Sequence, residues 1–181
     1  MAVTPDLTTK RLLLEPLHVE HADEMVDVLA PRELYEYYPD QESPTLDELR
    51  ATYTRQTQGH SDDGTQVWHN WIIRLRSTHE AAGFIQITVT GKLAEIAWVV
   101  GLPWQGMGYA AEAARDVRDA CLRGDTGDHI VAVFCHIAPT HVKSQAVAKA
   151  LGLNPTDTSH DGEIRWEQDE DASISTSRYL A

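Results

Sequence analysis

The most informative part of the sequence is residues 99–110, Val99-Val100-Gly101-Leu102-Pro103-Trp104-Gln105-Gly106-Met107-Gly108-Tyr109-Ala110. An apolar strand ends here, a loop with three glycines follows, and a helix begins at about Ala110. Glycines let a backbone approach a ligand closely. The N–H groups and the dipole at the start of a helix attract an anion without needing a lysine. The stretch therefore predicts a diphosphate site, although a plain tight turn from strand to helix would have the same composition.

Two standard phosphate-binding motifs do not fit this loop. The Walker motif requires Gly-Lys-Ser/Thr, whereas Gly108 is followed by Tyr109. The dinucleotide fingerprint GxGxxG ends on a glycine, and Ala111 stands at that position. Even with alanine allowed there, the loop follows a series of strands instead of opening a βαβ unit.

The residues before the loop predict an N-terminal strand, two helices and then three consecutive strands. The strands have period-two patterns and short links, which is typical of an antiparallel meander. The two helices are separated by an irregular loop over residues 30–44. The expected ranges are strands over 9–15, 67–75, 83–90 and 95–100, and helices over 22–29 and 45–58.

The residues after the loop predict an alternation of helix and strand. Helices are expected over 110–123 and 141–151, the second stopping at Gly152, with strands over 130–135 and 162–168. A crossover of this length makes strands 95–100 and 130–135 parallel neighbours. We therefore expect an α/β domain with a mixed sheet over residues 1–181, with a loosely ordered tail over 169–181.

Composition narrows the class of protein further. The 181 residues carry a formal net charge of −13, which argues against nucleic-acid binding and against attachment to an anionic membrane. The acidity favours a cationic substrate or partner, or serves solubility alone. The two cysteines lack CxxC spacing, and no signal-like or membrane-spanning run is present. We expect a soluble cytoplasmic protein with reduced thiols, either monomeric or homodimeric.

The glycine loop resembles the coenzyme A signature of the GNAT acetyltransferases, Gln/Arg-x-x-Gly-x-Gly/Ala, at Gln105, Gly108 and Ala110. Other segments are similar to the RimJ/RimL-like branch of that family, and the resemblance covers nearly the whole chain in the same order. Two positions depart from the pattern: Ala97 where glycine is usual, and His141 where asparagine is usual. The similar segments are residues 9–14, 94–100, 111–113, 137–144 and 147–153.

The resemblance implies a mixed, mostly antiparallel sheet of about seven strands with about four helices. Its fourth and fifth strands would be parallel and splay apart, with acetyl-CoA between them. The main chain of Val99 and Val100 would pair with the pantetheine arm. The pyrophosphate would be held by N–H groups of Gln105, Gly106, Met107, Gly108, Tyr109 and Ala110. The implied reaction is acetyl transfer to a primary amine of a small molecule or a protein N-terminus, by direct attack in a ternary complex.

Three residues are candidates for the chemistry. Glu95 is the best-placed general base, or else a solvated strand residue or an ion-pair partner. Ser144 matches the serine of the branch and would protonate the departing thiolate, or else bonds locally to the first turn of its helix. His141 would contact the cofactor or take part in proton transfer, or else is an exposed first-turn histidine. Cys135, in an apolar strand, is not needed as a nucleophile.

The acceptor would be bound by the loop between the first two helices. Tyr35, Glu36 and Tyr38 offer aromatic faces and a carboxylate for a cationic amine, although surface packing of the tyrosines explains them equally well. No metal is expected, because no HExxH or clustered His/Cys spacing occurs. Two alternatives remain open: an inactive acyl-CoA-binding module of the same fold, and an interaction domain without a nucleotide ligand.

Overall fold

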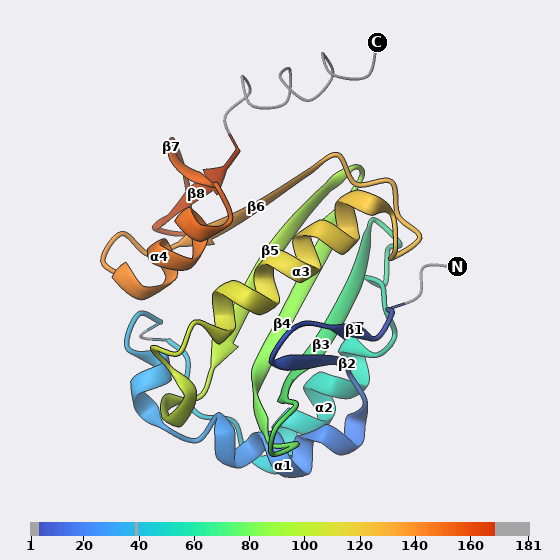
Figure 1. Ribbon diagram of the computed structural model, residues 1–181, viewed down its shortest axis with the longest axis vertical. Helices are drawn as coiled ribbons and strands as arrows, with labels where there is room; N and C mark the ends of the chain where they lie inside the picture. Colours follow the sequence, from blue (N-terminus) through green and yellow to red (C-terminus); the bar gives the residue numbers. More distant parts are fainter. Residues whose placement is uncertain (1–3, 39, 169–181) are drawn as a thin grey trace.

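The computed structural model describes residues 4–38 and 40–168, so the expected tail over 169–181 lies outside the described residues. Figure 1 shows the arrangement of the elements. The strands are β1 (Leu7–Thr8), β2 (Leu12–Pro16), β3 (Gln66–Leu75), β4 (Ala81–Thr90), β5 (Leu93–Val100), β6 (Ala132–Ile137), β7 (Asn154–His160) and β8 (Glu163–Glu167). The α-helices are α1 (Ala22–Val28), α2 (Leu46–Gln56), α3 (Tyr109–Arg123) and α4 (Val142–Ala150).

These strands form one mixed sheet in the order β1-β2-β3-β4-β5-β6-β8-β7. Neighbours are antiparallel except β5 and β6, which are parallel, as the crossover through α3 requires. The expected meander, the parallel pair and the α/β class are all confirmed. The described residues form eight strands. The expected first strand is interrupted, which shifts the numbering by one, so the parallel pair expected as the fourth and fifth strands is β5 and β6.

β5 and β6 pair over a short distance only. Their register runs from Leu93 opposite Ala132 to Glu95 opposite Phe134, and then the strands separate. β6 continues to Ile137 by pairing with β8 instead. The half of β5 that leads into the glycine loop therefore has a strand partner on its β4 side and none on its β6 side, within the described part of the chain. This V-shaped opening lies beside the start of α3 (Figure 1).

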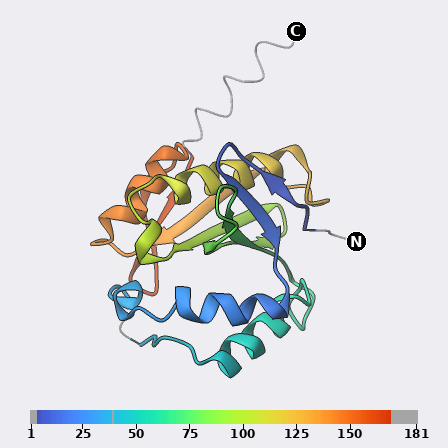
Figure 2. The same ribbon diagram turned by 60° about the horizontal axis from the view of Figure 1, so that its bottom comes forward.

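Helices cover both faces of the sheet, as Figure 2 shows: α1 and α2 lie on one side, α3 and α4 on the other. The alanine-rich stripe of α3 is buried against the sheet, including Ala113, Val117 and Cys121. Ile72 of β3 and Phe84 of β4 pack toward α1 and α2 on the opposite face. Apolar burial on two faces is what a helix–sheet–helix arrangement needs to hold its layers together.

Three sequence expectations are corrected. The strand expected over 9–15 is broken, because the Thr9 side chain accepts hydrogen bonds from Arg11 N and Leu12 N in a turn between β1 and β2. The strand expected over 130–135 is displaced to Ala132–Ile137. The expected irregular loop over 30–44 contains the 3-10 helix Arg32–Tyr35. The edge strand β7 was not expected at all.

The helix ends agree with the capping chemistry of the sequence. Thr45 accepts a hydrogen bond from Glu48 N at the start of α2, and the Glu48 side chain accepts one from Thr45 N in return. Gly152, just after α4, has a φ of 74°, the left-handed conformation expected of a helix stop.

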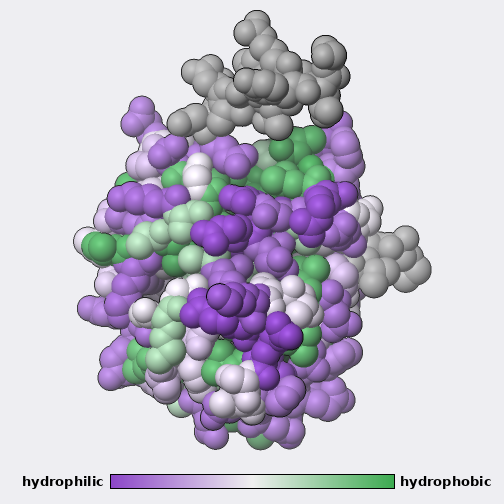
Figure 3. Space-filling model, viewed as in Figure 1, coloured by the Kyte–Doolittle hydropathy of each residue, from purple (hydrophilic) through white to green (hydrophobic). Residues whose placement is uncertain are grey.

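Figure 3 shows the face over α3 as mostly hydrophilic with separate hydrophobic spots. No helix within the described residues is long and apolar enough to cross a membrane.

Candidate functional site

The glycine loop forms a cradle of backbone donors at the start of α3. Gly106 and Gly108 have φ of 77° and 80°, a conformation in which glycine is favoured, and Gly108 is the N-cap of the helix. A Cβ at Gly106 would meet nothing within 4 Å, so this side of the loop is open. Among the described residues, the N–H groups of Gly106, Met107 and Gly108 have no acceptor. Unpaired donors beside a helix N-terminus fit a phosphate group.

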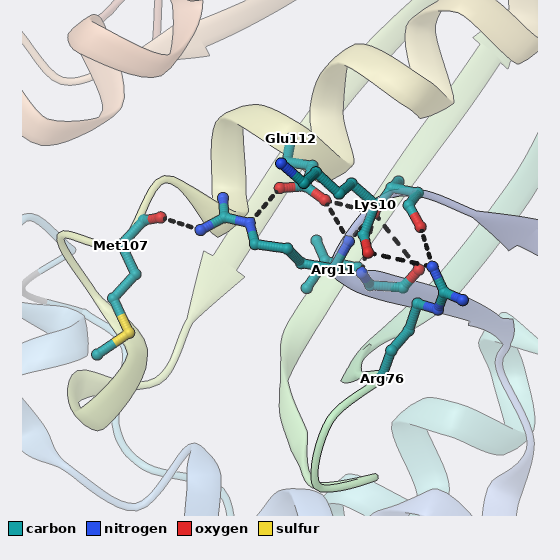
Figure 4. A network of polar contacts seen from close by, with 7 residues as sticks. Lys10, Arg11, Arg76, Met107 and Glu112 are labelled. Atoms are coloured by element: carbon teal, nitrogen blue, oxygen red, sulfur yellow. Dashed lines mark hydrogen bonds and ion pairs between the residues drawn. The ribbon is translucent and has the colours of Figure 1, made fainter.

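A second segment supports this loop from the side of β2, as Figure 4 shows. The Arg11 guanidinium donates to the Met107 carbonyl (2.8 Å) and to the Glu112 carboxylate (2.6 Å). Burial alone would raise the pKa of Glu112, but hydrogen bonds from Thr9 and Arg11 outweigh it and lower the pKa. Glu112 is therefore ionised at neutral pH and remains a strong acceptor.

The open end of the V is bridged by side chains. Gln105 donates from Nε2 to the Val100 carbonyl (3.0 Å) and accepts from Lys143 Nζ (2.9 Å) at its own Oε1. Lys143 lies in the first turn of α4, so this contact connects the β5 side to the β6 side of the opening. The Val100 carbonyl, expected to pair with a ligand, is thus already hydrogen-bonded to Gln105.

The first turn of α4 brings two of the candidate residues together. His141 is the N-cap, and its Nδ1 accepts from Ser144 N (3.4 Å) while its Nε2 lies 3.1 Å from Ser144 Oγ. The Tyr37 ring is stacked on the imidazole, with centroids 4.0 Å apart. Burial and then the charge of Lys143 lower the pKa of His141. The imidazole is therefore neutral at neutral pH and is not an exposed first-turn group.

A cavity of about 280 Å³ lies between the sheet and the α1–α2 segment. Its size is near the lower end of small-molecule pockets, which span roughly 300–1,000 Å³. Val99 lines this cavity from β5, the strand that also forms one side of the V. The other lining residues are mainly apolar or aromatic: Leu17, Leu29, Leu34, Tyr35, Tyr38, Gln41, Glu42, Pro44, Leu49, Thr52, Tyr53, Gln56, Asn70, Trp71 and Phe84.

Two of the three expected acceptor residues line the cavity. Tyr35 donates to the Leu29 carbonyl (2.9 Å), and burial raises its pKa. Burial, followed by the neighbouring Glu163 carboxylate of β8, raises the pKa of Tyr38 to about 12. Both hydroxyls therefore stay protonated as hydrogen-bond donors. Glu36 is not among the lining residues, and the carboxylate in the lining is that of Glu42.

Glu95 lies at the paired end of β5, away from the glycine loop. Its carboxylate contacts His136 Nδ1 at 2.6 Å and is 41% exposed. Glu95, Ala97 and Val99 alternate along one sheet face, so Glu95 is on the cavity side but about 13 Å along the strand from Val99. His136 is therefore the hydrogen-bonding partner of Glu95.

The two cysteines are buried and unpaired. The pKa of the Cys121 thiol and that of the Cys135 thiol are both raised to about 12, mainly by burial. A thiol with such a pKa is a poor nucleophile at neutral pH.

Comparison with known families decides the class of protein. Residues 11–154 match the acetyltransferase (GNAT) domain family. The chain belongs to the GNAT acetyltransferase family. Membership makes this GNAT protein an N-acetyltransferase that uses acetyl-CoA, which confirms the enzyme class, the fold and the cofactor expected from the sequence. A comparison with curated protein sequences finds no match.

Solved structures share the fold at low sequence identity. An acetyltransferase from Agrobacterium tumefaciens has a TM-score of 0.69 and 22% identity, with 94% of this chain and 97% of that one covered. RimL, a ribosomal L7/L12 α-N-protein acetyltransferase in complex with coenzyme A, has a TM-score of 0.71 and 15% identity, with 93% and 98% covered. AAC(6')-Ib in complex with ribostamycin and coenzyme A has a TM-score of 0.71 and 13% identity, with 93% of this chain and 98% of that one covered.

Sequence reasoning missed several residues of the site. Tyr37 lies within the expected irregular loop over 30–44, and nothing in the sequence spacing connects it to His141, which is 104 positions away. Arg11 was noted only for its place in an expected strand, and its contact with Met107 depends on the turn that replaces part of that strand. Tyr53 follows from helical periodicity as a core residue, but that periodicity does not show that a cavity adjoins it.

Proposed function

We propose that this GNAT enzyme transfers the acetyl group of acetyl-CoA to the primary amine of a small molecule with an apolar body, by direct attack in a ternary complex. The position of Val99 is the main support for this proposal. It belongs to the half of β5 that has no β6 partner, and it also lines the cavity. A donor in the V and an amine in the cavity would therefore meet at one strand.

The cofactor would be held by the main chain of the glycine loop and of β5. N–H groups from Gly106 to Ala110 would bind the pyrophosphate, and Val99 and Val100 would pair with the pantetheine arm. The Gln105 N–H, which was also expected to bind the pyrophosphate, instead donates to the Leu102 carbonyl (3.3 Å). The Val100 carbonyl would have to exchange its bond from Gln105 for one to the ligand. Acetyl-CoA supplies an activated acetyl thioester at this point. His141 and Ser144 lie on the opposite side of the opening, at the start of α4.

Proton transfer is assigned to two groups. Ser144 Oγ would donate a proton to the departing thiolate, and the neutral His141 beside it would hold the hydroxyl in position. Glu95, paired with His136, would accept the proton lost by the amine nitrogen, through water on the open sheet face. An amine that binds as the cation first releases one proton to water. The neutral amine then loses one proton to Glu95 as its C–N bond forms, and the departing thiolate gains one from Ser144 as the C–S bond breaks; exchange with water returns both side chains to their starting states.

The cavity lining supports an apolar acceptor. Leucines and aromatic rings dominate it, while Glu42 is the carboxylate among its described lining residues. A polycationic amine would lose its hydration there with too few carboxylates to compensate. A small arylalkyl or alkyl amine would instead gain about 25 cal/mol for each Å² of apolar surface it buries. Tyr35 and Tyr38 supply aromatic faces for the cationic form before it loses its proton.

A screen of amines with acetyl-CoA, read by thiol release and product mass, tests the proposal. Phenethylamine and hexylamine should be acetylated at lower KM than spermidine or an aminoglycoside, and a peptide N-terminus should react poorly. Binding of coenzyme A without turnover of any amine would favour the inactive acyl-CoA-binding module. Preferential acetylation of the polyamine would contradict the apolar acceptor.

A cavity-filling variant gives the structural control. Thr52 lines the cavity, whereas Thr54 on the same helix is exposed and bonds to the Arg50 carbonyl. Thr52→Trp should raise the KM for the best amine by about tenfold or more without changing the Kd for coenzyme A. Thr54→Trp should change neither quantity. Equal effects of the two substitutions would place the acceptor outside this cavity.

A further inference from the structure

The turn between β1 and β2 contacts the glycine loop directly, through the side chain of Arg11 (Figure 4). We propose that Arg11 is a positioning residue for the cofactor: it fixes the orientation of the Met107–Gly108 peptide so that the loop N–H groups face the phosphate site. This inference rests on the proposed binding of the pyrophosphate by the glycine loop. It assigns a role to a side chain outside the motif itself.

The contacts form a connected network. Arg11 Nη1 donates to the Met107 carbonyl at 2.8 Å, and Arg11 Nε donates to Glu112 Oε2 at 2.6 Å. Glu112 Oε1 accepts from Thr9 Oγ1 at 2.6 Å and from Arg11 N at 2.9 Å. Glu112 belongs to the first turn of α3, so Arg11 connects the loop to the helix that follows it. The Arg11 guanidinium also lies over the Tyr109 ring, 4.6 Å from its centroid.

Peptide geometry explains why this contact matters for a ligand. In a trans peptide the C=O of one residue and the N–H of the next point in opposite directions. Arg11 holds the Met107 carbonyl toward β2, so the N–H of Gly108 points away from β2. That N–H has no acceptor among the described residues. The left-handed φ of Gly108 permits this orientation, and the guanidinium keeps it in place without a ligand.

Arg11 acts by fixing the orientation of the Met107–Gly108 peptide more than by supplying a positive charge. The positive charge of Arg11 is already paired with the ionised Glu112 carboxylate at 2.6 Å. A planar guanidinium can reach a carboxylate and a carbonyl at fixed angles at the same time, which a lysine ammonium on a flexible stem cannot do. Arg11→Lys should therefore lose most of the effect although it keeps the charge.

Arg76 provides a matched control. Its Nη1 donates to the carbonyls of Thr9 (2.9 Å) and Lys10 (3.1 Å), so it holds the same turn from the other side. Within the described part of the chain, the hydrogen bonds of its side chain go to this turn and not to the glycine loop (Figure 4). Removing Arg76 disturbs the turn, whereas removing Arg11 disturbs both the turn and the loop.

The experiment measures the Kd for coenzyme A by calorimetry, together with kcat and KM for acetyl-CoA, in the wild-type chain and in Arg11→Gln, Arg11→Lys and Arg76→Gln. Losing a hydrogen bond from a charged donor predicts a coenzyme A Kd about tenfold weaker or more in both Arg11 variants. Their kcat at saturating acetyl-CoA should change by less than about threefold. Arg76→Gln should bind coenzyme A as the wild type does.

Each other outcome overturns the inference. Wild-type affinity in Arg11→Gln would show that the loop does not need Arg11, and an equal loss in Arg76→Gln would show a general effect of the turn. Wild-type affinity in Arg11→Lys alone would show that charge, not orientation, is what matters. A wild-type chain that does not bind coenzyme A would overturn the proposed function as well, which separates that failure from the others.

Discussion

The Tyr37 ring is stacked on the imidazole of His141, with centroids 4.0 Å and planes 14° apart. Tyr37 follows the 3-10 helix Arg32–Tyr35 in the segment beside the cavity, while His141 is the N-cap of α4 and contacts Ser144. The stack therefore connects the proposed acceptor loop to the proposed proton donor. It also contributes to the burial that lowers the pKa of His141.

Replacing the stacked ring should move the pH dependence of the reaction. In Tyr37→Ala, His141 loses part of its burial, so its lowered pKa rises toward the ordinary value of about 6.5. The imidazole then becomes protonated at a higher pH, and its Nδ1 ceases to accept the Ser144 N–H that helps to position this residue. The acidic limb of kcat/KM therefore shifts to higher pH. Tyr37→Phe keeps the ring and should keep the wild-type profile. Identical acidic limbs in wild type and Tyr37→Ala would refute the coupling.

Removing the proposed proton donor should slow turnover more than it weakens cofactor binding. Ser144→Ala deletes the hydroxyl beside His141 Nε2, and loss of general-acid catalysis costs about 100-fold or more in kcat. The Kd for coenzyme A should change by less than about threefold. Ser77→Ala, at an exposed turn between β3 and β4, serves as the control. A wild-type kcat in Ser144→Ala would exclude Ser144 from the mechanism.

The general base is tested by an isosteric change. Glu95→Gln retains a hydrogen-bonding group for His136 but cannot accept a proton from the amine. We expect kcat at neutral pH to fall about 100-fold while the melting temperature stays close to that of the wild type. Glu80→Gln, on an exposed carboxylate next to β4, controls for the loss of charge. If Glu95→Gln turns over normally, the pair with His136 is structural.

The glycine loop is tested by two valine substitutions. Gly108 and Gly91 both have positive φ, 80° and 62°, so valine is strained at either position by roughly 1–2 kcal/mol. A Cβ at Gly108 would lie in ordinary contact with Arg11, and one at Gly91 would meet nothing within 4 Å. Gly108→Val should abolish coenzyme A binding in calorimetry, while Gly91→Val should retain it. Similar affinities in the two variants would argue against the phosphate cradle.

The parts of the fold that were predicted are those with a strong burial pattern. The alternation in β3, β4 and β5 and the stripe on α3 follow from which side chains must face the core, and the parallel pairing of β5 and β6 follows from the crossover length. β7 was missed because an edge strand needs no buried face. Its sequence, NPTDTSH, is mostly exposed and polar and contains a proline.

The candidate site was predictable where local sequence determines local geometry. The glycine loop and the helix that begins just after it follow from the residues themselves, whereas the left-handed φ of Gly106 and Gly108 is a finding of the structure. The contacts made by Arg11, Tyr37 and Glu163 could not be predicted in the same way, because each joins segments that only the folded chain brings together. The cavity likewise depends on how α1 and α2 pack over the sheet.

The proposed function requires backbone N–H groups of the glycine loop to bind the pyrophosphate of acetyl-CoA beside the opening between β5 and β6. A crystal structure of the chain with coenzyme A tests it most directly. We expect phosphate oxygens within hydrogen-bonding distance, about 2.7–3.2 Å, of N–H groups between Gln105 and Ala110, with the pantetheine arm along Val99 and Val100. Pyrophosphate density elsewhere, with the loop N–H groups unbound to it, would contradict the claim.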